Sequence, residues 1–154
     1  HNTRFLHQFL DRYMETAGGD DELSLVFFDM DHFKTVVETH GHLLAAKVLR
    51  EVAEVVDSHL DPNDRIVRYG GDEYVVILPD QSADRALDKV ARLRIAIAET
   101  LFLVEEEIGV SVTASFGLAT YPHDAMDKRQ LLAEADRCLF ESKSLGRNVI
   151  VASQ

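Results

Sequence analysis

The residues best suited to chemistry lie in two short stretches, and each stretch contains acidic side chains at the end of an apolar run. The first is a run of apolar residues that ends at Asp29. The second contains the pair Gly70-Gly71, followed at once by Asp72 and Glu73. Adjacent like charges at a turn cost stability, so such a turn is a reasonable place to look for a metal or a proton-transfer group. Carboxylate oxygens, together with phosphate oxygens, are the usual ligands of Mg²⁺.

The hydrophobic pattern predicts the elements that position these acids. Residues 23–29 are apolar nearly throughout, which predicts a strand covered on both faces. Apolar runs rich in β-branched residues flank Gly70-Gly71, and glycine takes positive φ without steric cost, so we predict a tight hairpin. If the strand lies beside the hairpin, the carboxylates of Asp29 and Asp72 converge.

Periodicity predicts the remaining elements. Apolar residues at helical spacing predict helices over residues 3–16, 43–60, 83–103 and 127–145, with another helix that begins after Asp31. Alternating apolar residues predict a long strand over 110–121, and a short closing strand follows at 149–151. Asp31 stands where an N-cap would be, and we favour that interpretation over metal ligation. For Asp29, at the end of a buried strand, we favour metal ligation.

Composition limits the class of protein. The chain has 154 residues, is 46% hydrophobic and carries a net charge of −11, which argues against a nucleic-acid partner because such a surface needs a basic stripe. No apolar run approaches the ~20 residues of a membrane span. The single cysteine, Cys138, excludes an internal disulfide and fits a reducing compartment, so we expect a cytoplasmic domain.

Two histidine motifs need a separate explanation. His40 and His42 bracket Gly41, a spacing that can suggest zinc, but no further Cys or His stands at suitable spacing nearby. We interpret them as part of a break between two helices. His32 lies close to Asp29, yet Mg²⁺ prefers oxygen ligands, so we do not expect its imidazole to bind the metal.

Three motifs in order resemble those of one family. Gly70-Gly71-Asp72-Glu73-Tyr74 resembles the signature of the GGDEF family, the diguanylate cyclases, with Tyr in place of the final Phe. Residues 28–34 match the family's Asp-x-Asp-x-Phe-Lys motif. Residues 135–136 and 143–148 match its closing motif, so the resemblance spans nearly the whole chain.

The resemblance implies a fold and a reaction. The implied fold is α+β, with a central, mostly antiparallel five-stranded sheet flanked by helices, similar to the palm of polymerases and to nucleotidyl cyclases. The implied reaction joins two GTP molecules into cyclic di-GMP with release of pyrophosphate. Each protomer of a homodimer binds one GTP, and each 3′-hydroxyl attacks the α-phosphate of the other.

The resemblance also implies roles for individual residues. It places Mg²⁺ or Mn²⁺ on four residues: Asp29, the Met30 carbonyl, Asp72 and Glu73. It makes Asp72 and Glu73 the catalytic residues, with Glu73 helping to deprotonate the hydroxyl. It assigns substrate binding to the backbone of His32 and Phe33, the side chains of Lys34, Lys143 and Arg147, and the glycines Gly70 and Gly71.

The chain departs from the family at the positions that hold guanine. The family usually has Asn and Asp where this chain has Val37 and Ala46, and neither replacement can donate or accept a side-chain hydrogen bond. Three hypotheses remain: a cyclase that makes cyclic di-GMP, a cyclase whose base specificity is relaxed toward another base, and a catalytically silent module that binds a nucleotide and regulates a neighbouring domain. Asp61 stands where many members have the Arg of a product-inhibition site, so we predict that this inhibition is absent.

We expect residues 1–154 to form a single domain. The sequence starts at His1 without a methionine and leads directly into a helical pattern, which we interpret as a piece excised from a longer multidomain protein. Such a protein has room for an N-terminal sensor or regulatory domain and for a membrane anchor.

Overall fold

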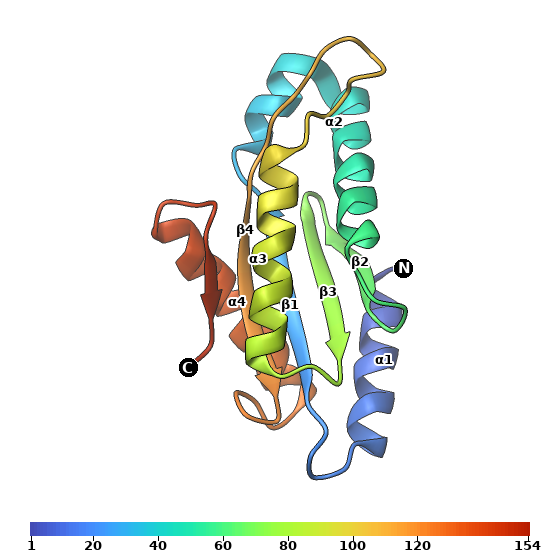
Figure 1. Cartoon of the computed structure of the whole chain (residues 1–154), viewed down its shortest axis with the longest axis vertical. Coiled ribbons are helices and arrows are strands. Elements are labelled where there is room, and N and C mark those ends of the chain that lie inside the picture. The colour runs from blue at the N-terminus through green and yellow to red at the C-terminus, as the bar shows by residue number, and fades with distance from the viewer.

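The computed structural model describes all residues, 1–154. The chain forms four helices and five strands, with β2 and β3 consecutive (Figure 1). Their bounds in chain order are α1 Thr3–Thr16, β1 Leu23–Met30, α2 Phe33–Ser58, β2 Arg65–Gly70, β3 Glu73–Pro79, α3 Ala83–Glu99, β4 Ala114–Tyr121, α4 Lys128–Ser144 and β5 Ile150–Ala152.

The strands form one sheet in the order β2-β3-β1-β4-β5. Strand β1 is central and pairs antiparallel with both β3 and β4, while β2 pairs antiparallel with β3. Only the β4–β5 pair is parallel. The predicted α+β fold with a mostly antiparallel five-stranded sheet is therefore confirmed.

Helices cover both faces of the sheet, which explains why β1 is apolar throughout. Val26 and Phe28 face one way and belong to the core cluster formed with α2 and α3. Leu25 and Phe27 face the other way and belong to the cluster formed with α1 and α4. Because successive strand side chains alternate between faces, a strand buried on both sides needs apolar residues at consecutive positions.

Helix α4 approaches the sheet closely at one glycine. A Cβ on Gly117 of β4 would lie 2.2 Å from the Leu139 nitrogen and 2.3 Å from the Ala135 oxygen, both backbone atoms of α4. Any side chain at this position would push the helix away from the sheet. The close contact fixes α4, whose residues Asp136 and Lys143 lie near the carboxylates described below.

The predicted break between two helices is found at Gly41, whose non-helical φ of 86° and ψ of 167° divide α2 at a kink. Two other predicted boundaries are wrong in detail. Helix α3 ends at Glu99, four residues early, because Phe102 leaves the helical path to pair with Val110. That pairing also takes Val110 out of the predicted long strand, and β4 begins only at Ala114.

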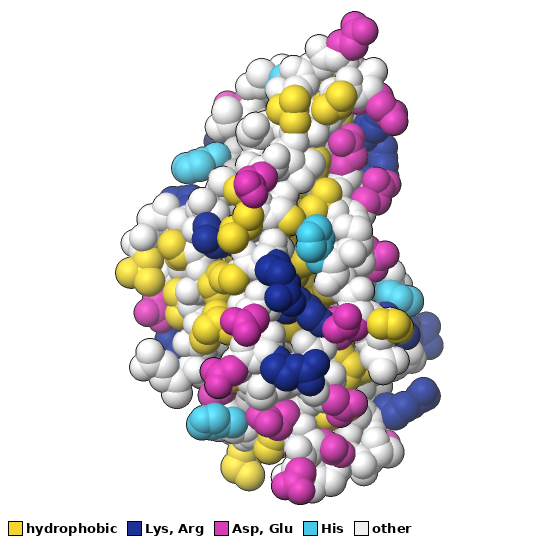
Figure 2. Space-filling model, viewed as in Figure 1, with side chains coloured by type: hydrophobic (Ala, Val, Ile, Leu, Met, Phe, Trp, Pro, Cys, Tyr) yellow, Lys and Arg dark blue, Asp and Glu magenta, His cyan; other side chains and the backbone are white.

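The surface is mixed in charge. On the face of Figure 2, Lys and Arg side chains are interspersed with Asp and Glu and do not form a continuous stripe. None of the helices is both long enough and apolar enough to cross a bilayer.

Candidate active site

The acids predicted to act together lie at one edge of the sheet. Strands β1 and β3 run antiparallel, so the end of β1 lies beside the start of β3, and Asp29 is directly opposite Glu73. The Met30 amide donates a hydrogen bond to the Asp72 carbonyl at 3.4 Å, which ties the end of β1 to the hairpin turn. The predicted convergence of the β1 end and the hairpin tip is found.

Two carboxylate oxygens at this edge are buried without a hydrogen-bond partner. They are Oδ1 of Asp29 and Oε1 of Glu73. A buried polar atom that makes no hydrogen bond is destabilising, and such atoms are rare in folded proteins. Two orphaned hard oxygen atoms from facing residues fit a divalent cation such as Mg²⁺ or Mn²⁺.

The carboxylates do not form a complete metal site alone. No three His, Cys, Asp or Glu side chains are arranged so that they could hold a metal by themselves. Mg²⁺ commonly binds one or two carboxylates and takes its other ligands from substrate phosphates and water. The donor set here fits a metal that arrives with a phosphate-bearing ligand.

Burial and mutual repulsion raise the proton affinity of these acids. Burial is the main cause that raises the pKa of Asp29 to about 6; the hydrogen bond from Lys143 lowers it and the nearby Asp72 raises it. Burial raises the pKa of Glu73 to about 7, with additional repulsion from Asp136 and Asp29. A carboxylate with a pKa near neutrality is suited to accept a proton under physiological conditions.

The three predicted phosphate-binding cations are placed differently. Lys143 Nζ lies 2.5 Å from Asp29 Oδ2 and is partly buried. Lys34 lies on the first turn of α2; its side chain is almost fully exposed, and its Nζ is 3.9 Å from Glu38 Oε1. Arg147 follows α4 and is exposed.

Helix α2 begins with backbone donors that no side chain caps. His32 is its N-cap, has left-handed backbone angles and makes no side-chain capping bond. The first N–H groups of a helix have no partner within the helix and favour anions. The predicted contacts of the His32 and Phe33 amides with phosphate stay a prediction.

The hairpin has the predicted position but not the predicted backbone angles. Gly70 pairs with Glu73, so Gly71 and Asp72 form the turn, and a register shift occurs between Arg68 and Gly70. Neither glycine has a positive φ, so the prediction that the turn uses glycine for a positive φ is wrong. A Cβ at either position would meet no atom within 4 Å, and the bare backbone is therefore open to a ligand.

A hollow of about 430 Å³ adjoins the hairpin tip. Val37 and Ala46, the substituted guanine positions, line it beside Lys34 and Asp72. Its other lining residues are Phe33, His42, Ala45, Leu49, Arg68 and Gly71. The part of the wall contributed by α2 between Val37 and Leu49 is mainly apolar.

Asp31 does not serve as the predicted N-cap. Its carboxylate is buried and accepts hydrogen bonds from Thr113 Oγ1 at 2.6 Å and from Ser115 Oγ at 2.7 Å. The cap position falls one residue later, at His32. The prediction failed because an acid directly after a strand can face the neighbouring strand instead of the helix.

Two residues near the site received no role from the sequence. Asp136 is close enough to raise the pKa of Glu73. The only feature of the sequence that pointed to Asp136 was its place in the closing motif. Arg68 donates from Nη2 to the Gly71 carbonyl at 2.6 Å and lines the hollow. The only feature of the sequence that pointed to Arg68 was its position, two residues before the glycine pair.

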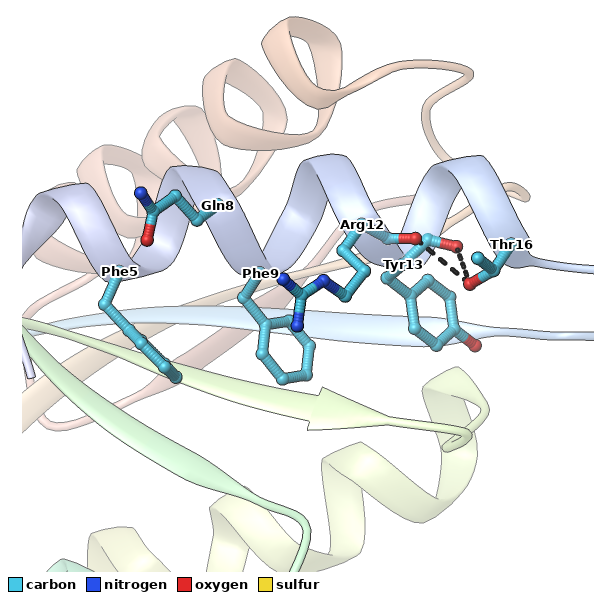
Figure 3. Close-up of a pocket in the computed structure, with 6 residues that line it drawn as sticks. All are labelled: Phe5, Gln8, Phe9, Arg12, Tyr13 and Thr16. Carbon is cyan, nitrogen blue, oxygen red and sulfur yellow. Dashed lines mark hydrogen bonds between the residues drawn. The ribbon is translucent and has the colours of Figure 1, made fainter.

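A separate hollow of about 310 Å³ follows α1 (Figure 3). It is lined by three aromatic side chains, Phe5, Phe9 and Tyr13, with polar residues of the same helix. The Tyr13 hydroxyl donates to the carbonyl of Glu22, just before β1, and therefore lies at the opposite end of that strand from Asp29. This hollow contains no acid cluster.

Comparison with known proteins decides the family. The family model "Diguanylate cyclase, GGDEF domain" matches residues 1–149. The chain belongs to the GGDEF family. Among curated relatives, diguanylate cyclase A of Treponema denticola is 34% identical over 134 residues, which cover 87% of this chain and 36% of that protein. The response regulator PleD of Caulobacter vibrioides is 34% identical over 153 residues, 98% of this chain and 34% of PleD.

Solved structures of GGDEF domains share the fold. The GGDEF domain of YfiN (TpbB) from Pseudomonas aeruginosa superposes with a TM-score of 0.94 at 27% identity and covers 100% of this chain and 96% of that one. The GGDEF domain of DgcB from Caulobacter crescentus, in complex with c-di-GMP, gives 0.87 at 28% identity over 98% and 90% of the two chains. This GGDEF chain spans about a third of the length of the curated relatives named above.

Proposed function

We propose that this GGDEF domain is a diguanylate cyclase that condenses two GTP molecules into cyclic di-GMP and pyrophosphate across a homodimer. Each protomer would bind one GTP at the hairpin edge. The product is two-fold symmetric, so two such edges must face each other when both phosphodiester bonds form.

One observation carries the proposal: Asp29 and Glu73, which are directly opposite each other beside the hairpin turn, each have one buried oxygen without a partner. Most buried acids that serve only packing have hydrogen-bond partners on their oxygens, and here two unpartnered oxygens belong to neighbouring residues. The arrangement supports a site completed by a cation and its phosphate ligand.

The residues at this edge would hold Mg²⁺ or Mn²⁺ through the carboxylates of Asp29, Asp72 and Glu73 and the Met30 carbonyl. When bound, the metal would polarise the α-phosphate and neutralise charge on the leaving pyrophosphate. Asp72 lies in the turn itself and raises the pKa of Asp29, so the two carboxylates share one electrostatic environment.

Side chains of the protein accept the proton and provide the positive charge that stabilises the phosphates. The 3′-oxygen of one GTP forms a bond to the α-phosphorus of the other, and the bond from that phosphorus to the pyrophosphate oxygen breaks. Glu73 accepts the proton of the 3′-hydroxyl, a role that suits a pKa raised to about 7. Lys34, Lys143 and Arg147 bind the β- and γ-phosphates and stabilise the leaving pyrophosphate, while Gly70 and Gly71 leave room for the nucleotide.

A second candidate function is favoured by the apolar wall of the hollow at the hairpin tip. Val37 and Ala46 line it where the family usually reads guanine. A cyclase relaxed toward another base, or a silent module that binds a nucleotide and regulates a neighbouring domain, would fit that wall. Intact Asp29, Asp72 and Glu73 favour the enzyme over the silent module.

We propose that product inhibition at the Asp61 position is absent. Asp61 and Asp64 both accept hydrogen bonds from Lys89 Nζ, at 2.6 and 2.5 Å. An anionic dinucleotide would have to compete with these carboxylates for the ammonium group. Titration of cyclic di-GMP onto the protein tests this, and tight stoichiometric binding that Lys89→Ala or Asp61→Ala alters would contradict it.

We further propose that residues 1–154 are one domain of a longer protein, joined to an N-terminal regulatory domain. The matched relatives are about three times as long as the part they share with this chain, which supports this arrangement.

The reaction can be tested directly. The domain is fused to a dimerising coiled coil, so that a weak monomer–dimer equilibrium does not hide activity. It is incubated with Mg²⁺ and GTP, ATP or both, and the products are identified by mass. We expect cyclic di-GMP from GTP. A mixed or adenine product would show that the base site has changed, and nucleotide binding without any cyclic dinucleotide would favour the silent module.

A further inference from the structure

The buried carboxylate of Asp31 joins three segments that are distant in sequence. Asp31 is 4% exposed and has no cation within salt-bridge distance. Besides the two hydroxyl donors from the Thr113–Ser115 segment, its Oδ2 accepts the backbone N–H of Asn148 at 3.0 Å. Its own amide donates to the Thr113 carbonyl at 2.8 Å. Both carboxylate oxygens therefore have donors, unlike those of Asp29 and Glu73.

The segment that Asp31 reaches has an unusual backbone. Gly146, Arg147 and Asn148 have φ values of 108°, 66° and 50°, three consecutive residues in the left-handed region. For residues other than glycine this conformation costs about 1 kcal/mol or more each, and it persists only where surrounding contacts enforce it. The strain therefore falls on Arg147 and Asn148.

The contacts that enforce this turn can be identified. The Arg147 amide donates to the Ser142 carbonyl at 3.2 Å, which closes the end of α4. The Asn148 amide is shared between Asp31 and Ser115 Oγ, the latter at 3.1 Å. Arg94 Nη1 lies 3.3 Å from Asn148 Oδ1. Of these partners, Asp31 is the only one in the segment between β1 and α2, which connects Asp29 near the end of β1 to Lys34 on the first turn of α2.

We infer that Asp31 is a positioning residue that holds the Gly146–Asn148 turn and thereby directs the Arg147 side chain toward a bound triphosphate. Asp31 itself touches no substrate and acts through Arg147. The inference rests on the proposed function, because it takes the phosphates to bind at this edge. It adds to that function by naming the residue that sets the orientation of one phosphate-binding cation.

A double-mutant cycle on a binding reaction tests the inference without requiring turnover. Affinity for Mg²⁺-pyrophosphate is measured by calorimetry for the wild type, Asp31→Ala, Arg147→Ala and the double variant. We expect Asp31→Ala and Arg147→Ala each to weaken binding about tenfold, the range for a lost hydrogen bond to a charged group. If Asp31 acts through Arg147, the double variant is no weaker than Arg147→Ala.

Two further variants separate positioning from general stability. Asp31→Asn keeps an oxygen for the Asn148 amide, so it should recover most of the affinity. If Asp31→Ala does not fold, Asp31→Ser takes its place in the cycle, because the shorter side chain withdraws the oxygen from the Asn148 amide and keeps a hydroxyl for the Thr113–Ser115 segment. Asp64→Asn changes an equally buried acid, 4% exposed, in the distant Lys89 network. We expect it to lower stability and leave pyrophosphate affinity unchanged.

The outcomes separate this inference from the proposed function. Additive losses in the double variant, or equal losses in Asp31→Ala and Asp64→Asn, would overturn the positioning role. Failure of the wild type to bind Mg²⁺-pyrophosphate would overturn it as well. Pyrophosphate binding with the expected cycle, but no cyclic dinucleotide from GTP, would contradict the cyclase and leave the positioning role established.

Discussion

Two groups of buried acids in this fold have opposite electrostatic environments. Asp64 is almost fully buried, and it is paired with Lys89 and accepts a hydrogen bond from Gln81 at 2.7 Å. At the hairpin edge, Asp29 has a single cation, Lys143, on one oxygen, while its other oxygen and one oxygen of Glu73 have no partner. The first group is satisfied by the protein itself, and the second is not.

The difference indicates which acids serve structure and which are available for a ligand. A buried carboxylate whose oxygens all have donors ties elements together. One that lacks donors keeps a raised pKa and a free coordination position, and a fold retains such a group at a cost in stability. We therefore assign function to the hairpin edge and a structural role to the Lys89 network.

The largest expected effect comes from the hairpin edge. Glu73→Gln removes the proposed proton acceptor and metal ligand with little change in shape, so turnover of GTP should fall at least ~100-fold while the protein stays folded. The rate of cyclic di-GMP formation measures turnover, and the circular dichroism spectrum shows whether the protein stays folded. Retention of more than a tenth of wild-type turnover would show that Glu73 does not take the proton.

The matching change in the structural group should affect stability instead. Asp64→Asn removes the buried charge opposite Lys89 and should lower the free energy of unfolding by about 3 kcal/mol. Turnover per folded molecule should not change. Denaturant titration measures the first quantity, and a loss of turnover comparable with that of Glu73→Gln would remove the distinction between the two groups.

Within the candidate site, the apolar wall at Val37 and Ala46 should affect which base is bound. Val37→Asn with Ala46→Asp restores polar groups to the apolar wall and should raise the preference for GTP over ATP by about tenfold. Competition binding with both nucleotides measures the ratio. Val37→Ala serves as a control that changes the side chain without adding a polar group. An unchanged ratio in the double variant would mean that the hollow does not hold the base.

The smallest expected effect is a pH dependence of stability after metal is removed by chelation. The folded-state pKa of Glu73, about 7, lies above its ordinary value of 4.5, so the folded state binds this proton more tightly than the unfolded state. The associated stability is present below pH 4.5 and is lost as pH rises through 7. The Tm should therefore decrease over this range, and it should decrease less steeply in Glu73→Gln. An identical slope in both proteins would contradict the raised pKa of Glu73 in the folded state.

Long apolar periodic segments predicted the strands and most helices, because they are strong local signals. The arrangement of the sheet came from the resemblance to the GGDEF family, and the convergence of Asp29 with the hairpin was predicted only on the condition that the two lie side by side. The sequence did not predict the role of Asp31, since nothing local distinguishes an N-cap from an acid that faces Thr113 and Ser115, more than eighty residues away. The start of β4 was missed for a similar reason: Val110 continues the alternating pattern but pairs with Phe102 outside the sheet.

Metal-dependent nucleotide binding tests the central claim, that the unpaired carboxylates at the hairpin edge hold a cation together with a nucleotide. Calorimetric titration of a non-hydrolysable GTP analogue, with and without Mg²⁺, is compared among the wild type, Asp29→Asn and Asp64→Asn. We predict Mg²⁺-dependent binding in the wild type and Asp64→Asn that is lost in Asp29→Asn. Binding that is equally strong without Mg²⁺, or that Asp29→Asn leaves intact, would contradict the claim.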